Sequence, residues 1–415
     1  MNLKVLHTAD WHLGQYFYEY DRTLEHLHFF DFLKKTIKEY EIDVLLICGD
    51  VFDVSNPSTS SISMFYKLLI DLTNQFESLQ IIIIGGNHDS ASRLELPNPI
   101  LKYFNIKIIG KIEKNEKGEI LSDKHIIPLN NKKSEIAAYC LAIPFIRPGE
   151  ISDINYSGLS YSDSITKLYA DITDKIQAIK TDNQALIAMG HLHTMKAEIS
   201  ENDKNERLIL GGLELINLQN FEEKISYFAL GHLHKAQKVS GTEHFRYSGS
   251  PLPMSFSEKN YLHQIVVIEF ENQKAKKIES VEIPRLIDIL KIPQKHAEIE
   301  IVLNELNNLE TINNEDEKIF APYLEVRVLL KEPEPNLRNK IEKQIENKRV
   351  KLAKIDIQYN STETELSSMT KSNEELQNLN PLNILEKAFQ QKYNSELPDK
   401  YKLLFNNILN ELENK

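Results

Sequence analysis

Five short motifs of aspartate, asparagine and histidine stand out in this 415-residue chain, each directly after a run of apolar residues. Carboxylate, imidazole and amide oxygen are ligands that suit Mn²⁺, Fe²⁺ or Zn²⁺, and the lack of cysteine in the motifs argues against a structural zinc site. In four of the five a glycine comes just before the first polar residue, where it lets the backbone turn sharply. The motifs are Asp10-Trp11-His12, Gly49-Asp50-Val51-Phe52-Asp53, Gly85-Gly86-Asn87-His88-Asp89, Gly190-His191-Leu192-His193 and Gly231-His232-Leu233-His234.

Each motif alone has an ordinary structural explanation. An Asp-x-His or Gly-Asp pair can cap a helix or form a turn, Gly-Asn-His-Asp can be a hairpin turn, and Gly-His-x-His can be a pair of hydrogen-bonded core histidines. The combination differs because all five follow strand-like runs, and the carboxyl ends of strands in an open α/β sheet meet at one crevice. Together the motifs predict a dinuclear metal site.

The elements that must position these motifs form a layered α/β pattern. Helical patterns separate the early apolar runs, and this β-α-β-α rhythm predicts one α/β domain over residues 1–275. We expect strands at residues 4–9, 43–48, 80–85, 136–143, 185–190, 226–231 and 264–270, and helices at 22–40 and 60–79.

Two further segments follow this domain. Strands expected at residues 286–292, 323–330 and 350–359, with helices at 294–308 and 336–348, predict a small α+β domain over 280–360. Residues 361–415 begin as a polar linker and end in an apolar stripe spaced for one helix face. That stripe serves either a partner subunit or this chain's own core.

Composition narrows the class of protein. The two cysteines, Cys48 and Cys140, are too few for a disulfide framework and lie in strand-like runs, which favours reduced core residues. The longest apolar runs are far too short to cross a bilayer, and the first residues have no signal-peptide layout, so we expect a cytoplasmic protein with no membrane association. The net charge of −12 slightly favours a substrate other than DNA. Binding of DNA would have to depend on local basic patches, bound cations or a partner.

The motif series resembles the calcineurin-type metallophosphoesterases, and longer strings narrow the resemblance to the bacterial SbcD nuclease family. These strings include His7-Thr8-Ala9-Asp10-Trp11-His12, Ala229-Leu230-Gly231-His232-Leu233-His234 and Tyr247-Ser248-Gly249-Ser250-Pro251. The resemblance is close over residues 1–275, whereas the later segments match only in layout. It implies a layered β-sandwich flanked by helices, a small α+β DNA-capping domain, and a C-terminal helical tail for an ATPase partner.

The resemblance also implies two divalent metal ions, with Mn²⁺ expected. It assigns one ion to Asp10, His12, Asp50 and His234, and the other to Asp50, Asn87, His191 and His232, with Asp50 bridging. His193 departs from the family pattern and is expected at the rim of the site. The implied activity is double-strand exonuclease and single-strand endonuclease cleavage in DNA repair, recombination and replication, by a homodimer within a heterotetramer. Since the chain lacks a Gly-x-x-x-x-Gly-Lys-[Ser/Thr] loop, ATP hydrolysis must come from an SbcC-type ATPase subunit.

Two residues are expected to act in catalysis without binding metal. His88 adjoins Asn87, so we assign it to transition-state stabilisation or to protonation of the leaving oxygen. Asp53 could accept a hydrogen bond from His88 and orient it, or could simply cap a loop. Basic residues close to the motifs are candidates for DNA contact by proximity alone: Arg22, Arg93, Arg147, Lys235 and Arg246.

Two rival functions remain open. A metallophosphatase acting on phosphomonoesters or cyclic nucleotides would use the same site and would suit the acidic charge, but the nuclease-like strings count against it. A non-catalytic DNA-end scaffold would need no histidine at position 88.

Overall fold

The computed structural model describes residues 1–151, 156, 158–195, 197, 215–239, 241–312 and 314–359, with seven single residues of the C-terminal segment. Two compact units divide the chain: Met1–Leu329 with Glu334–Gln358, and Leu330–Pro333 with Tyr359–Lys415. The expected linker and C-terminal helices at 361–415 therefore lie, apart from those seven residues, outside the described part.

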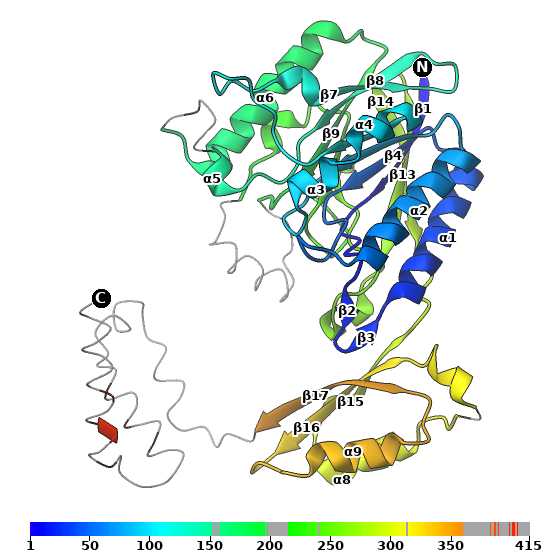
Figure 1. The fold of residues 1–415 in the computed structure, drawn as a ribbon, viewed down its shortest axis with the longest axis vertical. Coiled ribbons are helices and arrows are strands. Elements are labelled where there is room, and N and C mark those ends of the chain that lie inside the picture. Colours follow the sequence, from blue (N-terminus) through cyan, green and yellow to red (C-terminus); the bar gives the residue numbers. More distant parts are fainter. Residues whose placement is uncertain are drawn as a thin grey trace. The chain divides into compact units, whose positions relative to one another are not determined.

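Two six-stranded sheets form the core of the first unit (Figure 1). The first sheet has the order β14-β13-β1-β4-β5-β6, from Lys274–Glu282, Gln264–Glu271, Asn2–Thr8, Val44–Cys48, Gln80–Ile84 and Ile106–Ile109. The second has the order β11-β12-β10-β9-β8-β7, from Gln237–Lys238, Phe245–Tyr247, Tyr227–Gly231, Ala185–His191, Ile136–Ala142 and Ile126–Asn130. The expected β-sandwich is confirmed.

Helices cover the outer faces of both sheets. The amphipathic helices α1 (Thr23–Tyr40) and α2 (Thr59–Gln75) bury one face against the first sheet, and α6 (Tyr161–Ile179) covers the second. Ser58 begins α2 by accepting a hydrogen bond from the Ser61 amide at 3.1 Å, the usual role of serine at a helix start. Shorter elements are β2 (Tyr16–Phe17), β3 (Tyr20–Asp21), α3 (Ala91–Glu95), α4 (Asn98–Leu101) and α5 (Pro148–Ile151).

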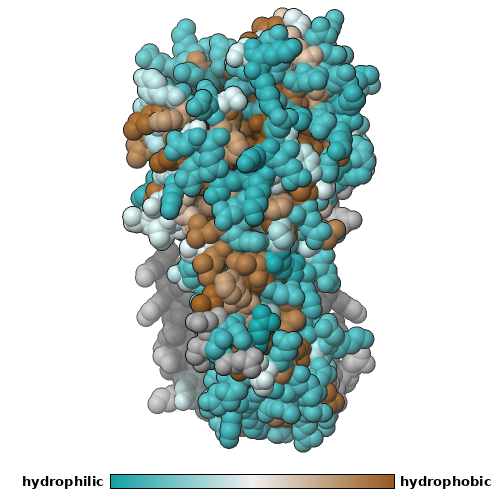
Figure 2. Space-filling view, turned by 90° about the vertical axis from the view of Figure 1, so that its right-hand side faces the viewer, coloured by the Kyte–Doolittle hydropathy of each residue, from teal (hydrophilic) through white to brown (hydrophobic). Residues whose placement is uncertain are grey.

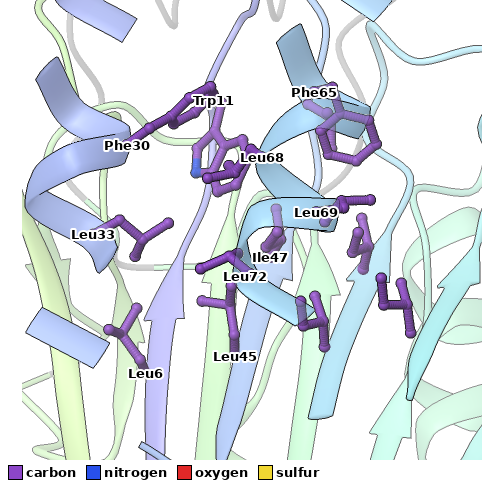
Figure 3. Close-up of a cluster of buried hydrophobic side chains, with 14 of the residues drawn as sticks. Leu6, Trp11, Phe30, Leu33, Leu45, Ile47, Phe65, Leu68, Leu69 and Leu72 are labelled. Carbon is purple, nitrogen blue, oxygen red and sulfur yellow. The ribbon is translucent and has the colours of Figure 1, made fainter. Parts of the chain in front are cut away.

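Trp11 anchors the first of the five motifs in the core. Its ring lies 5.6 Å from those of Phe29 and Phe30, and Figure 3 shows it between α1 and α2, next to Leu68. Its indole Nε1 donates to Thr8 Oγ1 at 3.0 Å. The apolar residue between two polar ones therefore holds Asp10 and His12 at the rim, because a buried tryptophan cannot move without disturbing its neighbours.

A three-stranded sheet and two helices form the smaller α+β part. The sheet order is β15-β16-β17, from Ile289–Ala297, Tyr323–Leu330 and Lys351–Tyr359, with α8 (Ile299–Asn307) and α9 (Leu337–Ile345). The helix expected at 294–308 was placed too early, because β15 continues to Ala297 and pairs there with Val328 after a register shift. The boundary expected at residue 275 also falls inside β14, which pairs with β13 as far as Glu282.

The surface turned to the viewer in Figure 2 is mainly hydrophilic, with hydrophobic residues gathered in a patch at mid-height. Across the described segments, no helix combines the length and the apolar character needed to cross a membrane.

Candidate metal centre

The strand ends bring all five motifs to one edge of the sandwich. The parallel strands β1, β4 and β5 end just before Asp10, Asp50 and Asn87, and the parallel strands β9 and β10 end at His191 and Gly231. Gly231 is required there, because a Cβ atom would collide with the carbonyl oxygen of Cys48 on the other sheet.

Four of the expected ligands have a strained backbone. Their φ angles are positive, in the region that favours glycine: Asp10 (55°), His12 (48°), Asp50 (48°) and His232 (100°). Such conformations cost about 1–3 kcal/mol each and persist where the surrounding structure enforces them, commonly at functional sites. The strain therefore marks this edge independently of the residue types.

The first group of donor atoms lies around His12 and His234. Their Nε2 atoms face each other at 3.2 Å, and His12 Nε2 lies 3.7 Å from Asp50 Oδ2. The opposite ring nitrogens face carboxylates: His12 Nδ1 lies 3.2 Å from Asp53 and His234 Nδ1 lies 3.5 Å from Glu258. When each Nδ1 carries the proton, both Nε2 atoms present lone pairs, an arrangement that suits a shared cation. Asp10 Oδ2 is buried and has no hydrogen-bond partner among the described residues, so it also fits a metal ligand.

The second group lies around Asn87 Oδ1. His191 Nε2 and His232 Nδ1 each approach this oxygen to 2.9 Å, and His191 Nε2 also lies 3.2 Å from Asp50 Oδ2. Because His191 Nδ1 donates to the carbonyl oxygen of Cys48 at 2.9 Å, the lone pair of its Nε2 faces two oxygen atoms. Only a proton or a metal ion would relieve that repulsion. Asp50 belongs to both groups, as expected of a bridging ligand.

The electrostatics of the cluster show how strongly it attracts positive charge. Burial opposes protonation of His191, but Asp50 and Asp10 raise the pKa of this imidazole to about 9. Burial would raise the pKa of Asp50, yet His191 and His12 hold it well below its usual range. Burial also raises the pKa of Asp10 to about 6. The residues present therefore fit two divalent cations of the hard or borderline type.

His88 and Asp53 are adjacent, but not in the expected way. His88 Nδ1 lies 2.7 Å from the main-chain oxygen of Asp53, whose carboxylate instead faces His12. The Asp53 side chain therefore orients His12, an expected metal ligand, rather than His88. Donor atoms of His12, Asp50 and His88 lie within 4.8 Å of one another, so His88 lies at the first group and is only partly buried.

Three residues at the site have roles that the motifs did not reveal. Asp89 is buried and accepts hydrogen bonds from the amides of Gly86 (2.9 Å), Phe52 (3.0 Å) and Val51 (3.1 Å), which ties two ligand loops together. Glu258 backs His234, and Arg147 Nη2 donates to the Asn87 carbonyl oxygen at 3.1 Å. Asp89 stands inside a motif and could have been found, whereas nothing in the spacing points to Glu258.

Some expectations about the surroundings are wrong. Arg22 and Arg246, two of the candidates for DNA contact, are buried, and each pairs with a glutamate three residues away. His193 is 4% exposed, and its ring lies 4.1 Å from that of His232, so it is packed beneath the site rather than at the rim.

Comparison with known proteins agrees with this geometry. Residues 3–236 match the family described as Calcineurin-like phosphoesterase, and residues 285–393 match the Type 5 capsule protein repressor C-terminal domain. The SbcD subunit of nuclease SbcCD from Rhodobacter capsulatus is 32% identical over 74% of this chain and 76% of its own. The SbcD subunits of Escherichia coli K12 and Bacillus subtilis are 33% and 28% identical, over 68% and 64% of this chain and 68% and 66% of theirs. The chain thus belongs to the SbcD family of nuclease subunits, within the calcineurin-like phosphoesterases.

Proposed function

We propose that this chain is the metal-dependent nuclease subunit of an SbcC–SbcD-type complex, hydrolysing phosphodiester bonds of DNA during end processing. One observation carries the proposal: Asp50 is shared by two convergent groups of nitrogen and oxygen donors in a chain of the SbcD family. The two groups contain six of the seven expected ligands, His12, Asp50, Asn87, His191, His232 and His234, and Oδ1 of the seventh, Asp10, lies 3.8 Å from His191 Nδ1.

The size of the barrier supports metal-dependent chemistry. Hydrolysis of a phosphodiester needs a barrier reduction of about 20 kcal/mol, whereas a positioned general acid supplies about 10²–10⁴-fold, or roughly 3–5 kcal/mol. A pair of divalent ions supplies the remainder when bound, by polarising the phosphate, lowering the pKa of a water and neutralising developing charge. We assign Mn²⁺ to this pair because the resemblance to the SbcD family implies it and the nitrogen and oxygen donor set admits it.

Residues of the chain hold the expected metal ligands in place and orient their rings. Asp53 and Glu258 fix the rings of His12 and His234, and the Cys48 carbonyl fixes that of His191. His88 is partly buried, and its Nδ1 lies 2.7 Å from the Asp53 carbonyl oxygen, which holds the ring beside the first group of donor atoms. We assign His88 to stabilisation or protonation of the leaving group.

The assembly follows from the same proposal. An SbcC-type ATPase supplies ATP hydrolysis, and we assign its docking to the apolar stripe after residue 380. Cutting of double-stranded ends and of single strands is the proposed pair of activities. We also assign the chain to the cytoplasm, the compartment of its proposed DNA substrate.

An exposed apolar stripe supports a homodimer. Leu96, Ile100 and Tyr103 are 79%, 67% and 78% exposed and lie just after α3, on α4 and in the turn that follows α4, beside half-exposed Phe104. Single exposed apolar residues are ordinary, but four within nine residues indicate an interaction surface. We assign a second copy of the chain to this surface. Ile100→Asp should give a monomer by light scattering, whereas Leu24→Asp, an exposed leucine on α1, should not; a dimeric Ile100→Asp protein would contradict the assignment.

Cleavage of linear DNA tests the function directly. The chain should degrade duplex ends and cut single strands with Mn²⁺, faster with the ATPase partner, and Asp50→Ala should abolish both reactions. Asp31→Asn, which removes an exposed carboxylate of α1, is the matched control and should retain both. Hydrolysis of p-nitrophenyl phosphate without any DNA cleavage would instead identify a phosphomonoesterase.

A further inference from the structure

Arg22 lies at the centre of a buried polar network outside the metal site. Its guanidinium donates from Nε and Nη2 to both carboxylate oxygens of Glu25, at 3.0 and 2.8 Å. Nη1 donates at 2.7 Å to Gln15 Oε1 and at 2.7 Å to the carbonyl oxygen of Pro253. A buried ion pair is costly to desolvate and often adds little stability, so its retention suggests a positional role.

Tyr323 joins this network from the smaller α+β part. Its hydroxyl donates to Glu25 Oε2 at 2.8 Å, and its ring stacks on Phe17 with centroids 4.6 Å apart. Glu25 lies in the first turn of α1, whereas Tyr323 begins β16, so one carboxylate joins two parts that are almost 300 residues apart in sequence. Tyr20 adds a second link, since its hydroxyl donates to the carbonyl oxygen of Leu352 in β17 at 3.0 Å.

The other side of the network reaches the loop that carries His12 and the segment that supports His234. The main-chain amide of Gln15 donates to the carbonyl oxygen of His12 at 3.0 Å. Next to Pro253, the Met254 amide donates to Glu258 Oε2 at 2.8 Å, and Glu258 backs His234. Arg22 thus contacts the loop that carries His12 directly, and it reaches His234 indirectly, through Pro253, Met254 and Glu258.

The strand face that bears Tyr323 continues into charged residues. Tyr323, Glu325 and Arg327 alternate along β16 and so lie on one face. Lys291 on β15 is in register with Glu325, and Lys354 on β17 lies 3.3 Å from it. Three cations therefore share this face with the carboxylates of Glu325 and Asp356, so its formal charge is +1 in a chain whose net charge is −12.

We propose that Tyr323, Glu25 and Arg22 form a positioning relay that fixes the β16 face relative to the metal ligands and thereby favours duplex over single-stranded DNA. The inference depends on the proposed nuclease function. A single strand needs only the metal site, whereas a duplex presents a second line of phosphates that the fixed cations can engage. The three residues hold other groups in place and do not touch the reacting atoms.

Tyr323→Phe tests the relay with little risk to the fold. The ring stack remains, and Glu25 Oε2 keeps its hydrogen bond from Arg22 Nε, so no buried charge is left alone. Tyr40→Phe is the matched control, because Tyr40 donates to Glu279 at 3.0 Å from the other end of α1. With Mn²⁺, we expect the ratio of duplex to single-strand kcat/KM to fall about tenfold in Tyr323→Phe, mainly through the duplex KM, as for loss of one hydrogen bond to a charged group. The ratio in Tyr40→Phe should match that of the native chain.

An unchanged ratio of duplex to single-strand kcat/KM in a folded Tyr323→Phe protein would overturn the inference, whether both rates stay native or both fall by the same factor. Tyr20→Phe is the second variant and should lower the ratio in the same direction by a smaller factor, since its hydrogen bond joins neutral groups. A Tyr20→Phe protein with the native ratio would also count against the relay. Failure of the native chain to cleave either DNA would overturn the proposed function instead, so the two failures are distinguishable.

Discussion

Replacing Asp89 with asparagine should weaken metal binding although Asp89 is no ligand. Asp89 Oδ2 accepts from the amides of Gly86 and Val51, and Oδ1 accepts from that of Phe52. These bonds join the loop that carries Asp50 to the loop that carries Asn87. An amide offers only one oxygen, so in Asp89→Asn at least one of the three backbone N–H groups would face an NH₂ group.

The magnitude follows from the bonds that are lost. A hydrogen bond to a charged group contributes about 1.5–3 kcal/mol, and a buried N–H left without an acceptor costs about 1–3 kcal/mol. A net loss of about 3 kcal/mol is therefore expected. If half of this free energy is lost from metal binding, because the two ligand loops move apart, Mn²⁺ affinity should fall about tenfold. If nearly all of it is lost from metal binding, the affinity should fall about a hundredfold.

Calorimetric titration with Mn²⁺ measures the affinity, and urea unfolding of the metal-free chain measures the stability. Asp43→Asn is the control, because Asp43 accepts from the Lys4 amide at 2.8 Å at the far end of β4 from Asp50. That variant should lose stability and keep its Mn²⁺ affinity. An affinity in Asp89→Asn within threefold of native would show that the ligand loops hold their spacing without Asp89.

Three further predictions address chemistry, pH and metal removal. His88→Ala should keep both ions, as measured by metal analysis, and its rate of cleavage at saturating Mn²⁺ should fall about 10²–10⁴-fold in single-turnover kinetics. Loss of an ion would make His88 a ligand. Burial lowers the pKa of His7 to about 3 and that of His263 to about 4, so both stay neutral when folded while the unfolded chain binds protons near 6.5. Stability should thus be full above pH 6.5 and fall as the pH drops toward 4, and a urea midpoint unchanged between pH 7.5 and 5 would contradict this. Mn²⁺ at about 100 times its Kd should raise the free energy of unfolding by about 2.7 kcal/mol per site, and Asp50→Ala should remove that increase.

The sequence predicted the position of an element well where a pattern repeats over several residues. Continuous apolar runs predicted β4 and β5 within a residue, because strands buried on both faces carry no polar positions. It was less informative for β14, whose exposed Lys and Glu residues resemble a loop although β13 pairs with it throughout. The start of α8 was misplaced because residues 294–297 extend β15 before the helix begins.

At the site, sequence could indicate which residues converge but not which atoms face each other. The expected Asp53–His88 pairing failed because the two meet through the main chain, and no side-chain pattern reveals a carbonyl oxygen. Arg22 has the sequence context of a surface charge, yet Glu25, Gln15 and Tyr323 surround it in the folded chain. Buried polar networks of this kind join residues far apart in sequence, so spacing alone does not disclose them.

The most direct test of the central claim measures bound metal and DNA cleavage on the same preparation. The chain is loaded with Mn²⁺, freed of excess ion, and analysed for metal per chain and for cleavage of linear duplex and single-stranded DNA. The two donor groups that share Asp50 predict two ions per chain with cleavage of both DNAs, and loss of both ions and all cleavage in Asp50→Ala. One ion per chain, or full activity in Asp50→Ala, would contradict the two-metal nuclease.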